Sequence, residues 1–362
     1  MTKANGALDK HSELLDLAGL KNLQTLAIIG TSKNAGKTTC LNHIIAAWSA
    51  KNMPRPLALT SIGRDGEDED VVSGRAKPRI YISAGTLIAT AEAAMQRADA
   101  LLNVLELSGV RTAFGEVVIS RALSDGYIEL AGPSSASELS SIGAILRNHA
   151  PDCLYIIDGA LSRRSQAGGG ITNDIILSAS GETSAIPSEL AEYVQHNLNL
   201  LSLPELDTEQ KTVLSQAIET TTTARVFSLK ITEDRPHLEW LELPTLLGHA
   251  PEIGALIKKE TKLLFLRGAI TDAIITELLK EPHFRKLKLV VEDGTRLFIN
   301  AKTYKQIKAR KIDLAVLHPL TVRLICLNPS RSDGAPVDGE AMLSALRRIT
   351  DIPVVDLGPA LV

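Results

Sequence analysis

One short stretch near the start of the chain constrains its fold more than any other. Residues 26–29 are apolar and have the length of a buried strand, and residues 30–39 read Gly-Thr-Ser-Lys-Asn-Ala-Gly-Lys-Thr-Thr. Four apolar side chains then recur at helical spacing, which predicts a helix directly after the loop. They are Leu41, Ile44, Ile45 and Trp48. This order of strand, loop and helix favours an α/β fold built on a parallel sheet.

The loop carries residue types that bind phosphate. A glycine-rich turn lets backbone N–H groups point at an anion, and the following helix presents its positive N-terminal end. Lys37 would reach the terminal phosphates of a nucleotide, and the Thr38 hydroxyl would hold Mg²⁺. The alternative is a chance Gly-Lys-Thr at an ordinary strand-to-helix turn. The residues expected to bind nucleotide are Gly30, Thr31, Asn34, Ala35, Gly36, Lys37, Thr38 and Thr39.

Composition favours two domains and argues against some partners. The chain has 362 residues, of which 44% are hydrophobic, which suffices for more than one buried core. Its 39 basic and 42 acidic residues give a net charge of −3. Nothing in this balance indicates a nucleic acid or an anionic membrane. Small-molecule and protein partners are therefore favoured, and the oligomeric state stays open.

Cysteine and histidine patterns indicate neither a disulfide framework nor a zinc site. Cys40, Cys153 and Cys326 lie far apart in the sequence, and we expect no close pair among them. The eight histidines show no zinc-type spacing. Charged residues interrupt the first 20 positions, unlike a signal peptide, and no apolar stretch reaches the ~20 residues of a membrane span. These features predict a cytoplasmic protein.

The alternation of strand and helix patterns suggests domain boundaries. We expect an N-terminal extension over 1–22, a nucleotide-binding domain over 23–200, a connector over 201–260 and a smaller α/β domain over 261–362. The connector is expected because residues 198–223 lack a clear apolar face and end in four threonines.

The first domain is expected to contain a largely parallel sheet with an antiparallel hairpin. Residues 116–122 and 127–131 flank Asp125-Gly126, a strong turn signal. Apolar residues between 87 and 95 predict a helix, and Ser137 is expected to cap the next one. Further strands are predicted at 56–60, 79–82, 153–157, 174–178, 263–266, 287–291, 315–317, 323–327 and 354–355, and further helices at 188–194, 271–279 and 342–348.

An aspartate at the end of a predicted strand is a candidate metal ligand. Residues 154–157 are apolar and are followed by Asp158-Gly159. At the carboxyl end of a sheet, Asp158 would lie beside Thr38 and hold Mg²⁺ directly or through water. The alternative is an aspartate that merely begins a turn.

Two further loops carry candidate catalytic or substrate-binding residues. Asp65 follows the second strand, where it could orient an attacking water, with Arg64 and Glu67 beside it in a loop that would contact substrate or switch. Arg163 could stabilise transferred phosphoryl charge, and Lys77 is a weaker candidate for holding substrate. The expected catalytic set is Lys37, Asp65, Asp158 and Arg163; solvated surface charge is the competing interpretation of the loop residues.

The loop resembles those of known ATP enzymes. Gly30-Thr31, four further residues and Gly36-Lys37-Thr38 resemble the P-loops of dethiobiotin synthetase and the cobyrinic and cobyric acid synthetases. The glycines are one residue further apart than in the common loop. The resemblance covers the first strand-loop-helix unit and implies a P-loop fold. It also suggests a ligase in which ATP activates a carboxylate held by Arg64, Lys77 or Arg163.

A second resemblance covers most of the first domain. The order of motifs looks like that of P-loop reactivases of cobalamin-dependent lysine aminomutase. The motifs are residues 30–39, 59–67, 77–78, 85–86, 130–133 and 156–161. This resemblance implies a Mg²⁺-dependent ATPase that acts on a partner enzyme. The sequence favours ATP without excluding GTP, and the carboxylate-activating ligase remains the alternative.

Overall fold

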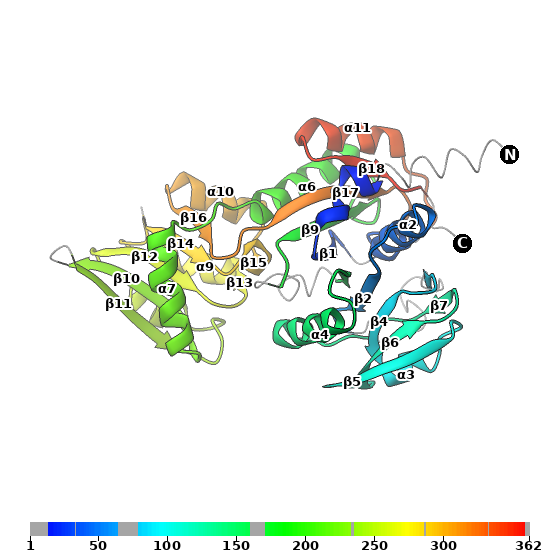
Figure 1. The fold of residues 1–362 in the computed structure, drawn as a ribbon. Helices are drawn as coiled ribbons and strands as arrows, with labels where there is room; N and C mark the ends of the chain where they lie inside the picture. Colours follow the sequence, from blue (N-terminus) through cyan, green and yellow to red (C-terminus); the bar gives the residue numbers. More distant parts are fainter. Residues whose placement is uncertain are drawn as a thin grey trace. The chain divides into compact units, whose positions relative to one another are not determined.

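The computed structural model describes residues 14–32, 34–63, 79–159, 171–232, 235–285, 287–331 and 333–358. The chain divides into two compact units (Figure 1). Unit 1 comprises Met1–Asn197 and Thr321–Val362, and unit 2 comprises Leu198–Leu320. Unit 1 is therefore assembled from both ends of the chain, with unit 2 inserted between them.

Nine strands form one mostly parallel sheet in unit 1, in the order β18-β17-β9-β1-β8-β2-β4-β6-β5. Neighbours are parallel from β18 to β4, whereas β6 is antiparallel to both β4 and β5. An α/β fold with a largely parallel sheet is thus confirmed. The strands are β1 Thr25–Gly30, β2 Leu57–Ser61, β4 Leu87–Ala91, β5 Leu102–Thr112, β6 Gly115–Ala122, β8 Leu154–Asp158, β9 Asp174–Ser180, β17 Thr321–Asn328 and β18 Val354–Asp356.

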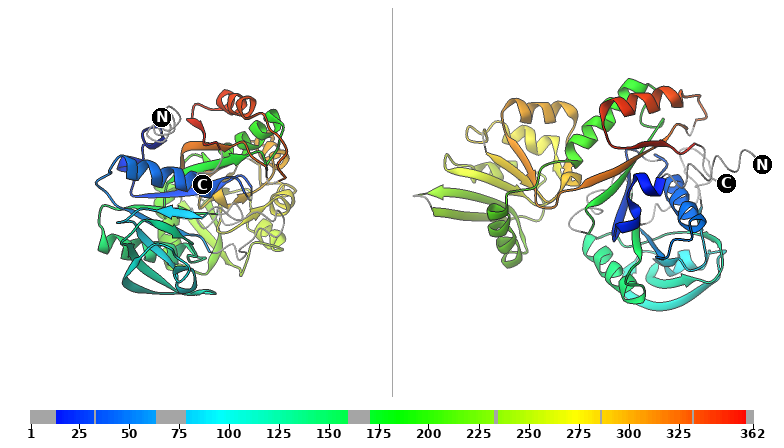
Figure 2. Two further views of the ribbon diagram at one scale, coloured as in Figure 1. Left: turned by 90° about the vertical axis from the view of Figure 1, so that its right-hand side faces the viewer. Right: turned by 45° about the horizontal axis from the view of Figure 1, so that its top comes forward.

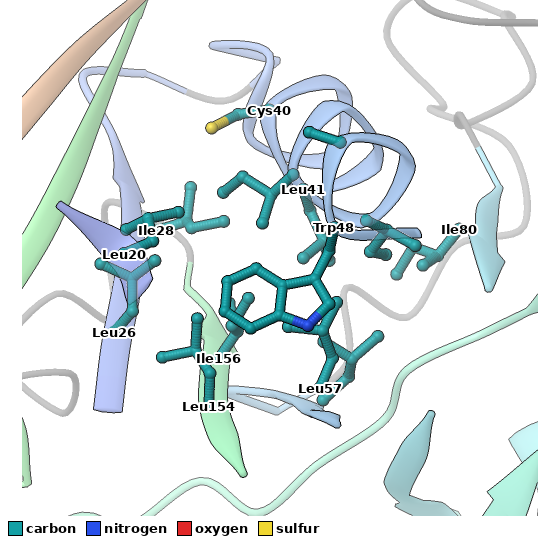
Figure 3. Close-up of a cluster of buried hydrophobic side chains, with 14 of the residues drawn as sticks. Leu20, Leu26, Ile28, Cys40, Leu41, Trp48, Leu57, Ile80, Leu154 and Ile156 are labelled. Atoms are coloured by element: carbon teal, nitrogen blue, oxygen red, sulfur yellow. The ribbon is translucent and has the colours of Figure 1, made fainter. Parts of the chain in front are cut away.

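Helices cover both faces of this sheet. Successive side chains of a strand point to opposite faces, and in the central strands both sets are buried. On one face, Leu154 and Ile156 of β8 join a buried cluster with Trp48 of α2 (Figure 3). On the other face, Tyr155 donates a hydrogen bond to the Leu139 carbonyl of α4 at 3.2 Å. Helix α11 lies beside β18 (Figures 1 and 2). The helices are α2 Lys37–Ala50, α3 Glu92–Met95, α4 Ala136–His149, α6 Pro187–Leu201, which continues into unit 2, and α11 Gly339–Ile349.

Residues 87–91 form strand β4, so the predicted helix over 87–95 is wrong except for its last four residues, which form α3. All five side chains of β4 are buried. A short apolar run buried on both faces has no period of two, and such a run cannot be distinguished from a helix by its pattern.

The antiparallel part of unit 1 also differs from the predicted hairpin. Strand β6 pairs with β4 and with β5, whereas β7 (Gly126–Ile128) pairs with β3 (Ile80–Ile82) in a separate two-stranded antiparallel sheet. The turn around Asp125 therefore connects two sheets. The Asp125 carboxylate accepts a hydrogen bond from the Ala84 N–H at 2.8 Å, which holds this turn against the segment after β3.

The described part of the N-terminal extension packs onto unit 1. Leu14, Leu15 and Leu20 are buried in the same cluster as Leu26 of β1. The 3-10 helix η1 spans Leu20–Asn22. Arg55 fixes this segment by donating hydrogen bonds to the carbonyls of residues 21 and 23 at 2.5 and 2.6 Å. These residues are thus part of the core of unit 1.

Unit 2 contains a five-stranded mixed sheet in the order β11-β10-β12-β14-β16. Strands β12, β14 and β16 are parallel, and β10 is antiparallel to its two neighbours. One face packs on α7, and the other packs on α8, α9 and α10. The elements are α7 Thr208–Thr220, β10 Ala224–Thr232, β11 Arg235–Glu242, α8 Ala250–Ala255, β12 Thr261–Leu266, β13 Ile270–Thr271, α9 Asp272–Leu278, β14 Lys288–Val291, η3 Gly294–Arg296, β15 Leu297–Phe298, α10 Ala301–Ala309 and β16 Asp313–Val316. No helix among the described residues is long and apolar enough to cross a bilayer.

The unit boundaries differ from the expected domains. Residues 201–260, expected to be a connector, contain α7, β10, β11 and α8 of unit 2, and residues 321–356, expected in the smaller domain, contain β17, α11 and β18 of unit 1. Two buried polar side chains, Ser228 and Lys230, interrupt the apolar pattern of β10 and conceal it in the sequence. The pairing of β17 with β9 spans unit 2 and leaves no local pattern.

Candidate functional site

The candidate site is the loop from Gly30 to Lys37, here called the 30–37 loop, at the carboxyl end of β1. The strand ends at Gly30 and α2 begins at Lys37, so the predicted order of strand, loop and helix is confirmed. Asn34 and Gly36 have left-handed backbones, with φ of +60° and +85°. A left-handed residue within such a turn directs successive N–H groups to one side, which forms a concavity that suits anions.

The N-terminus of α2 retains its positive character. The first intrahelical hydrogen bond runs from the Cys40 N–H to the Gly36 carbonyl at 2.9 Å, so the N–H groups of residues 37–39 precede it. No described side chain caps this helix, and its first turn has no acidic residue. In contrast, Ser135 and Asp207 cap α4 and α7 with side-chain oxygens. The partial positive charge at the start of α2 is therefore not offset by a capping side chain of the described chain.

The Lys37 side chain folds back over the loop. A Cβ atom built onto Gly30 would lie 3.2 Å from Lys37 Nζ and 2.9 Å from Ala35 Cβ. The ammonium group therefore lies at the end of β1, close to the turn. A side chain at position 30 would collide with Ala35 Cβ and crowd the Lys37 ammonium group, which gives this glycine a steric role.

The two threonines that follow Lys37 differ in exposure. Thr38 is half-buried, whereas Thr39 is only 3% exposed. Of the two hydroxyl-bearing side chains, Thr38 is thus the one that a ligand in front of α2 could reach.

Thr31 was expected to bind nucleotide, but the protein itself engages its polar groups. Its N–H donates to the Ser178 carbonyl at 2.8 Å, and its hydroxyl lies 2.8 Å from that of Thr183. The Tyr193 hydroxyl donates to the Thr31 carbonyl at 3.2 Å. Thr31 therefore shapes the loop and anchors it to the segment that follows β9.

Asn328, the last residue of β17, is a neighbour of the loop that the sequence analysis did not single out. A Cβ atom on Gly36 would lie 2.7 Å from Asn328 Cβ and 2.9 Å from Asn328 Nδ2. Its carboxamide oxygen accepts hydrogen bonds from the Ser330 N–H and hydroxyl at 3.3 and 2.6 Å. The only signal in the sequence was its position directly after a predicted strand.

Asp158 ends β8 at the same edge of the sheet. Its Cα is in register with Ile28 of β1 and Ser61 of β2. Because these strands are parallel neighbours, their carboxyl ends and the 30–37 loop lie along one edge, where open α/β sheets bind ligands. Asp158 is half-buried. Asp158 thus ends its strand at the edge of the sheet where the 30–37 loop begins, and its action together with Thr38 stays a prediction.

Two cysteines lie together beside this site, which corrects the expectation of no close pair. Cys40 Sγ of α2 and Cys326 Sγ of β17 are 3.3 Å apart, and both side chains are buried. The hydrogen bond with Cys326 and burial raise the pKa of Cys40, and the negative charge of Asp158 adds to this effect. The pair was missed because the fold, and not the local sequence, brings β17 under α2.

Some predicted site residues are not placed. Arg64, Asp65, Glu67, Lys77 and Arg163 lie outside the described residues, so their roles stay predictions. Within the described residues, no group of three or more acidic, histidine or cysteine side chains forms a metal site.

Unit 1 also has a cavity of about 320 Å³ at the opposite end of α2. Trp48, Asn52, Arg55 and Thr86 contribute to its lining. The Trp48 indole N–H donates to the Arg55 carbonyl at 2.7 Å, and the Arg55 guanidinium donates to the carbonyl of Asp152 at 2.5 Å. These polar groups form hydrogen bonds within the protein itself. The 30–37 loop is therefore the stronger candidate for a ligand-binding site. Comparison of the chain with known protein families, curated proteins and solved structures finds no match.

Proposed function

We propose that the 30–37 loop binds the phosphates of ATP together with Mg²⁺ and that the chain hydrolyses it. One observation carries this proposal: the N-terminus of a 14-residue helix, which no described side chain caps, follows a left-handed turn, with the Lys37 ammonium group folded against that turn. N–H groups, helix end and ammonium group supply positive charge at one point, as a triphosphate requires.

Each residue has a distinct task in this proposal. The backbone N–H groups from Gly36 to Thr39 would hold the phosphate oxygens, and Lys37 would neutralise the terminal phosphates. The Thr38 hydroxyl and the Asp158 carboxylate would hold Mg²⁺, which offsets charge that develops on the transferred phosphoryl group. Asp65 and Arg163 remain proposed for orienting water and stabilising charge.

Replacing Lys37 tests the nucleotide site. In Lys37→Ala, loss of a charge-assisted hydrogen bond of about 1.5–3 kcal/mol should weaken Mg-ATP binding roughly 10- to 150-fold. Lys51→Ala is the matched control, because Lys51 follows the other end of α2 and pairs with Asp16 at 2.8 Å. Calorimetric titration measures both. Equal affinity in Lys37→Ala and wild type would overturn the proposal.

The magnesium ligand is tested separately. Asp158→Asn keeps the size of the side chain but removes its charge, so ATP hydrolysis should require a higher Mg²⁺ concentration for half-maximal rate. Asp152→Asn, in the turn before β8, controls for the loss of one acidic residue. An unchanged Mg²⁺ requirement in Asp158→Asn would leave this residue with only a structural role.

We further propose that hydrolysis drives a conformational cycle on a partner enzyme, as the resemblance to reactivases implies. Such an ATPase turns over slowly alone and faster with its protein partner, whereas a ligase turns over only with its small substrate. Phosphate release is therefore to be measured with a cobalamin-dependent aminomutase and, separately, with small carboxylates. Stimulation by carboxylates alone would favour the ligase.

A further inference from the structure

The outer edge of the large sheet in unit 1 is formed by β5, an 11-residue strand (Figure 1). Among the described residues, no strand pairs with its outer side. Exposed edge strands offer N–H and C=O groups to another strand, and proteins usually protect them with lysine, proline or short length. Residues 101–108 read Leu-Leu-Asn-Val-Leu-Glu-Leu-Ser, with no proline or basic residue.

This edge also carries exposed apolar side chains. Leu101, Val104, Leu107 and Leu123 are 62%, 51%, 63% and 56% exposed. Leu101 and Leu123 are neighbours, because the Leu123 N–H donates to the Leu101 carbonyl at 2.7 Å. Four such side chains along one sheet edge indicate an interaction surface, in contrast to single apolar residues scattered over a surface.

A β-bulge places two of these residues on one face. Val104 is opposite Ser120 of β6, and Leu107 is opposite Val118, so Leu105 is an extra residue in β5. Positions 118 and 120 share a face of the sheet, and therefore Val104 and Leu107 share it too. Leu102, which is opposite Ala122, lies on the same face.

The other face of β5 is polar. Asn103 is opposite Arg121, and Glu106 is opposite Ile119, so these two β5 residues share the second face. Glu106 contacts His149 Nε2 of α4 at 2.8 Å, which identifies this face as the one that α4 covers. The free edge is thus apolar on one face and uncharged except for Glu106 on the other between residues 102 and 107.

We propose that β5 pairs with β5 of a second copy of this chain, antiparallel across a two-fold axis at Val104. Because Leu105 is the extra residue of the bulge, it is left out of the pairing. The axis then brings Val104 beside the partner's Val104, Leu102 beside the partner's Leu107 and Asn103 beside the partner's Glu106. Apolar groups meet apolar groups on one face, and an amide meets a carboxylate on the other. Moving the axis to Glu106 would place two carboxylates side by side, which is unfavourable.

Two features favour a second copy as the occupant. Strand β5 is antiparallel to β6, and β6 to β4, so an antiparallel β5 continues the order of the sheet. A two-fold axis makes any such contact with itself antiparallel and closes the assembly as a dimer. A second copy of β5 therefore supplies the backbone groups that this edge can pair with.

The oligomeric state of the full chain tests the proposal. Light scattering coupled to size exclusion should give the mass of a dimer for wild type and of a monomer for the double variant Val104→Lys/Leu107→Lys. The control Ile186→Lys/Leu247→Lys adds the same charge at positions 51% and 52% exposed and should stay dimeric. A monomeric wild type, or a double variant that stays dimeric, would overturn the proposal.

Cross-linking tests the position of the axis without disturbing the edge. Oxidised glutathione should convert Val104→Cys to a disulfide-linked dimer, because the two thiols meet at the axis and transfer two electrons and two protons to the oxidant. The two copies of Leu107→Cys lie about 13 Å apart along the strands, four residue steps of ~3.3 Å, and should remain uncross-linked. The natural cysteines are buried. Equal cross-linking of both variants would contradict this register.

Discussion

At the scale of single residues, the 30–37 loop is held by contacts that the motif alone does not reveal. The motif correctly predicted the order of strand, loop and helix that β1 and α2 form. It could not show that Thr31 is engaged by Ser178, Thr183 and Tyr193, or that Asn328 packs on Gly36, because those partners come from distant segments. The loop is thus anchored by side chains that only the tertiary fold supplies.

Gly36 has a left-handed backbone and a close neighbour, Asn328. The free-energy cost of backbone strain and the cost of the steric collision can be measured separately. Gly36→Ala should destabilise the protein by about 2–3 kcal/mol, because alanine is strained at this φ and its Cβ would collide with Asn328. Gly19→Ala should cost about 1 kcal/mol, since Gly19 has φ +63° but a Cβ there meets nothing within 4 Å. Urea unfolding measures both.

A second variant isolates the collision. In the Asn328→Gly background, the additional cost of Gly36→Ala over Gly19→Ala should shrink because the opposing Cβ is gone. An equal cost for the two alanine variants in the wild-type background would show that Asn328 does not pack closely on Gly36.

At the scale of secondary-structure elements, the sequence predicted the parallel strands best. Strands β1, β2, β8 and β9 are buried apolar runs, and each lies close to its predicted position. Strand β5 was missed because bulges and an exposed edge remove its alternation. Strand β4 was mistaken for a helix because both of its faces are buried.

Helix α4 begins at a different serine from the one expected. Ser135 is the N-cap, and its hydroxyl oxygen accepts from the Glu138 N–H at 3.3 Å and donates to the Glu138 carboxylate at 2.7 Å. Ser135→Ala should therefore lower the free energy of unfolding by about 1 kcal/mol, whereas Ser137→Ala should change it by less than about 0.5 kcal/mol. Chemical denaturation distinguishes the two; a larger loss in Ser137→Ala would assign the cap to Ser137.

At the scale of the whole molecule, the sequence correctly predicted the α/β class and more than one compact unit. It could not predict that unit 2 is inserted into unit 1, because the pairing of β17 with β9 joins segments on either side of the insertion. The expected connector was a misinterpretation of α7 and of β10, a strand with buried Ser228 and Lys230. Pairing of distant segments is the information that local patterns lack.

Unit 2 should lose stability in acid through His318, which follows β16. Burial lowers the pKa of His318 below 6.5, and Lys211 acts in the same direction, against the charges of Asp293, Glu292 and Glu205. The unfolded chain therefore binds a proton more readily than the folded one. Stability should be highest above pH 6.5 and fall as the pH decreases through the lowered pKa.

His318→Asn should flatten this part of the stability profile, as measured by thermal unfolding at several pH values. His283→Asn, at an exposed position, controls for the loss of a histidine. A profile that keeps its slope in His318→Asn would assign the acid sensitivity to other groups.

The insertion of unit 2 also has a consequence during synthesis on the ribosome. Residues 181–320 separate the end of β9 from the start of β17. At about 5–20 residues per second, translation of these 140 residues takes roughly 7 to 28 seconds. Throughout that interval β9 is a border of the nascent sheet that lacks its partner strand β17. Unit 2 can fold before β17 is synthesised. A message cut short after residue 320 would release a polypeptide with that border permanently uncovered, a product suited to capture by chaperones or proteases.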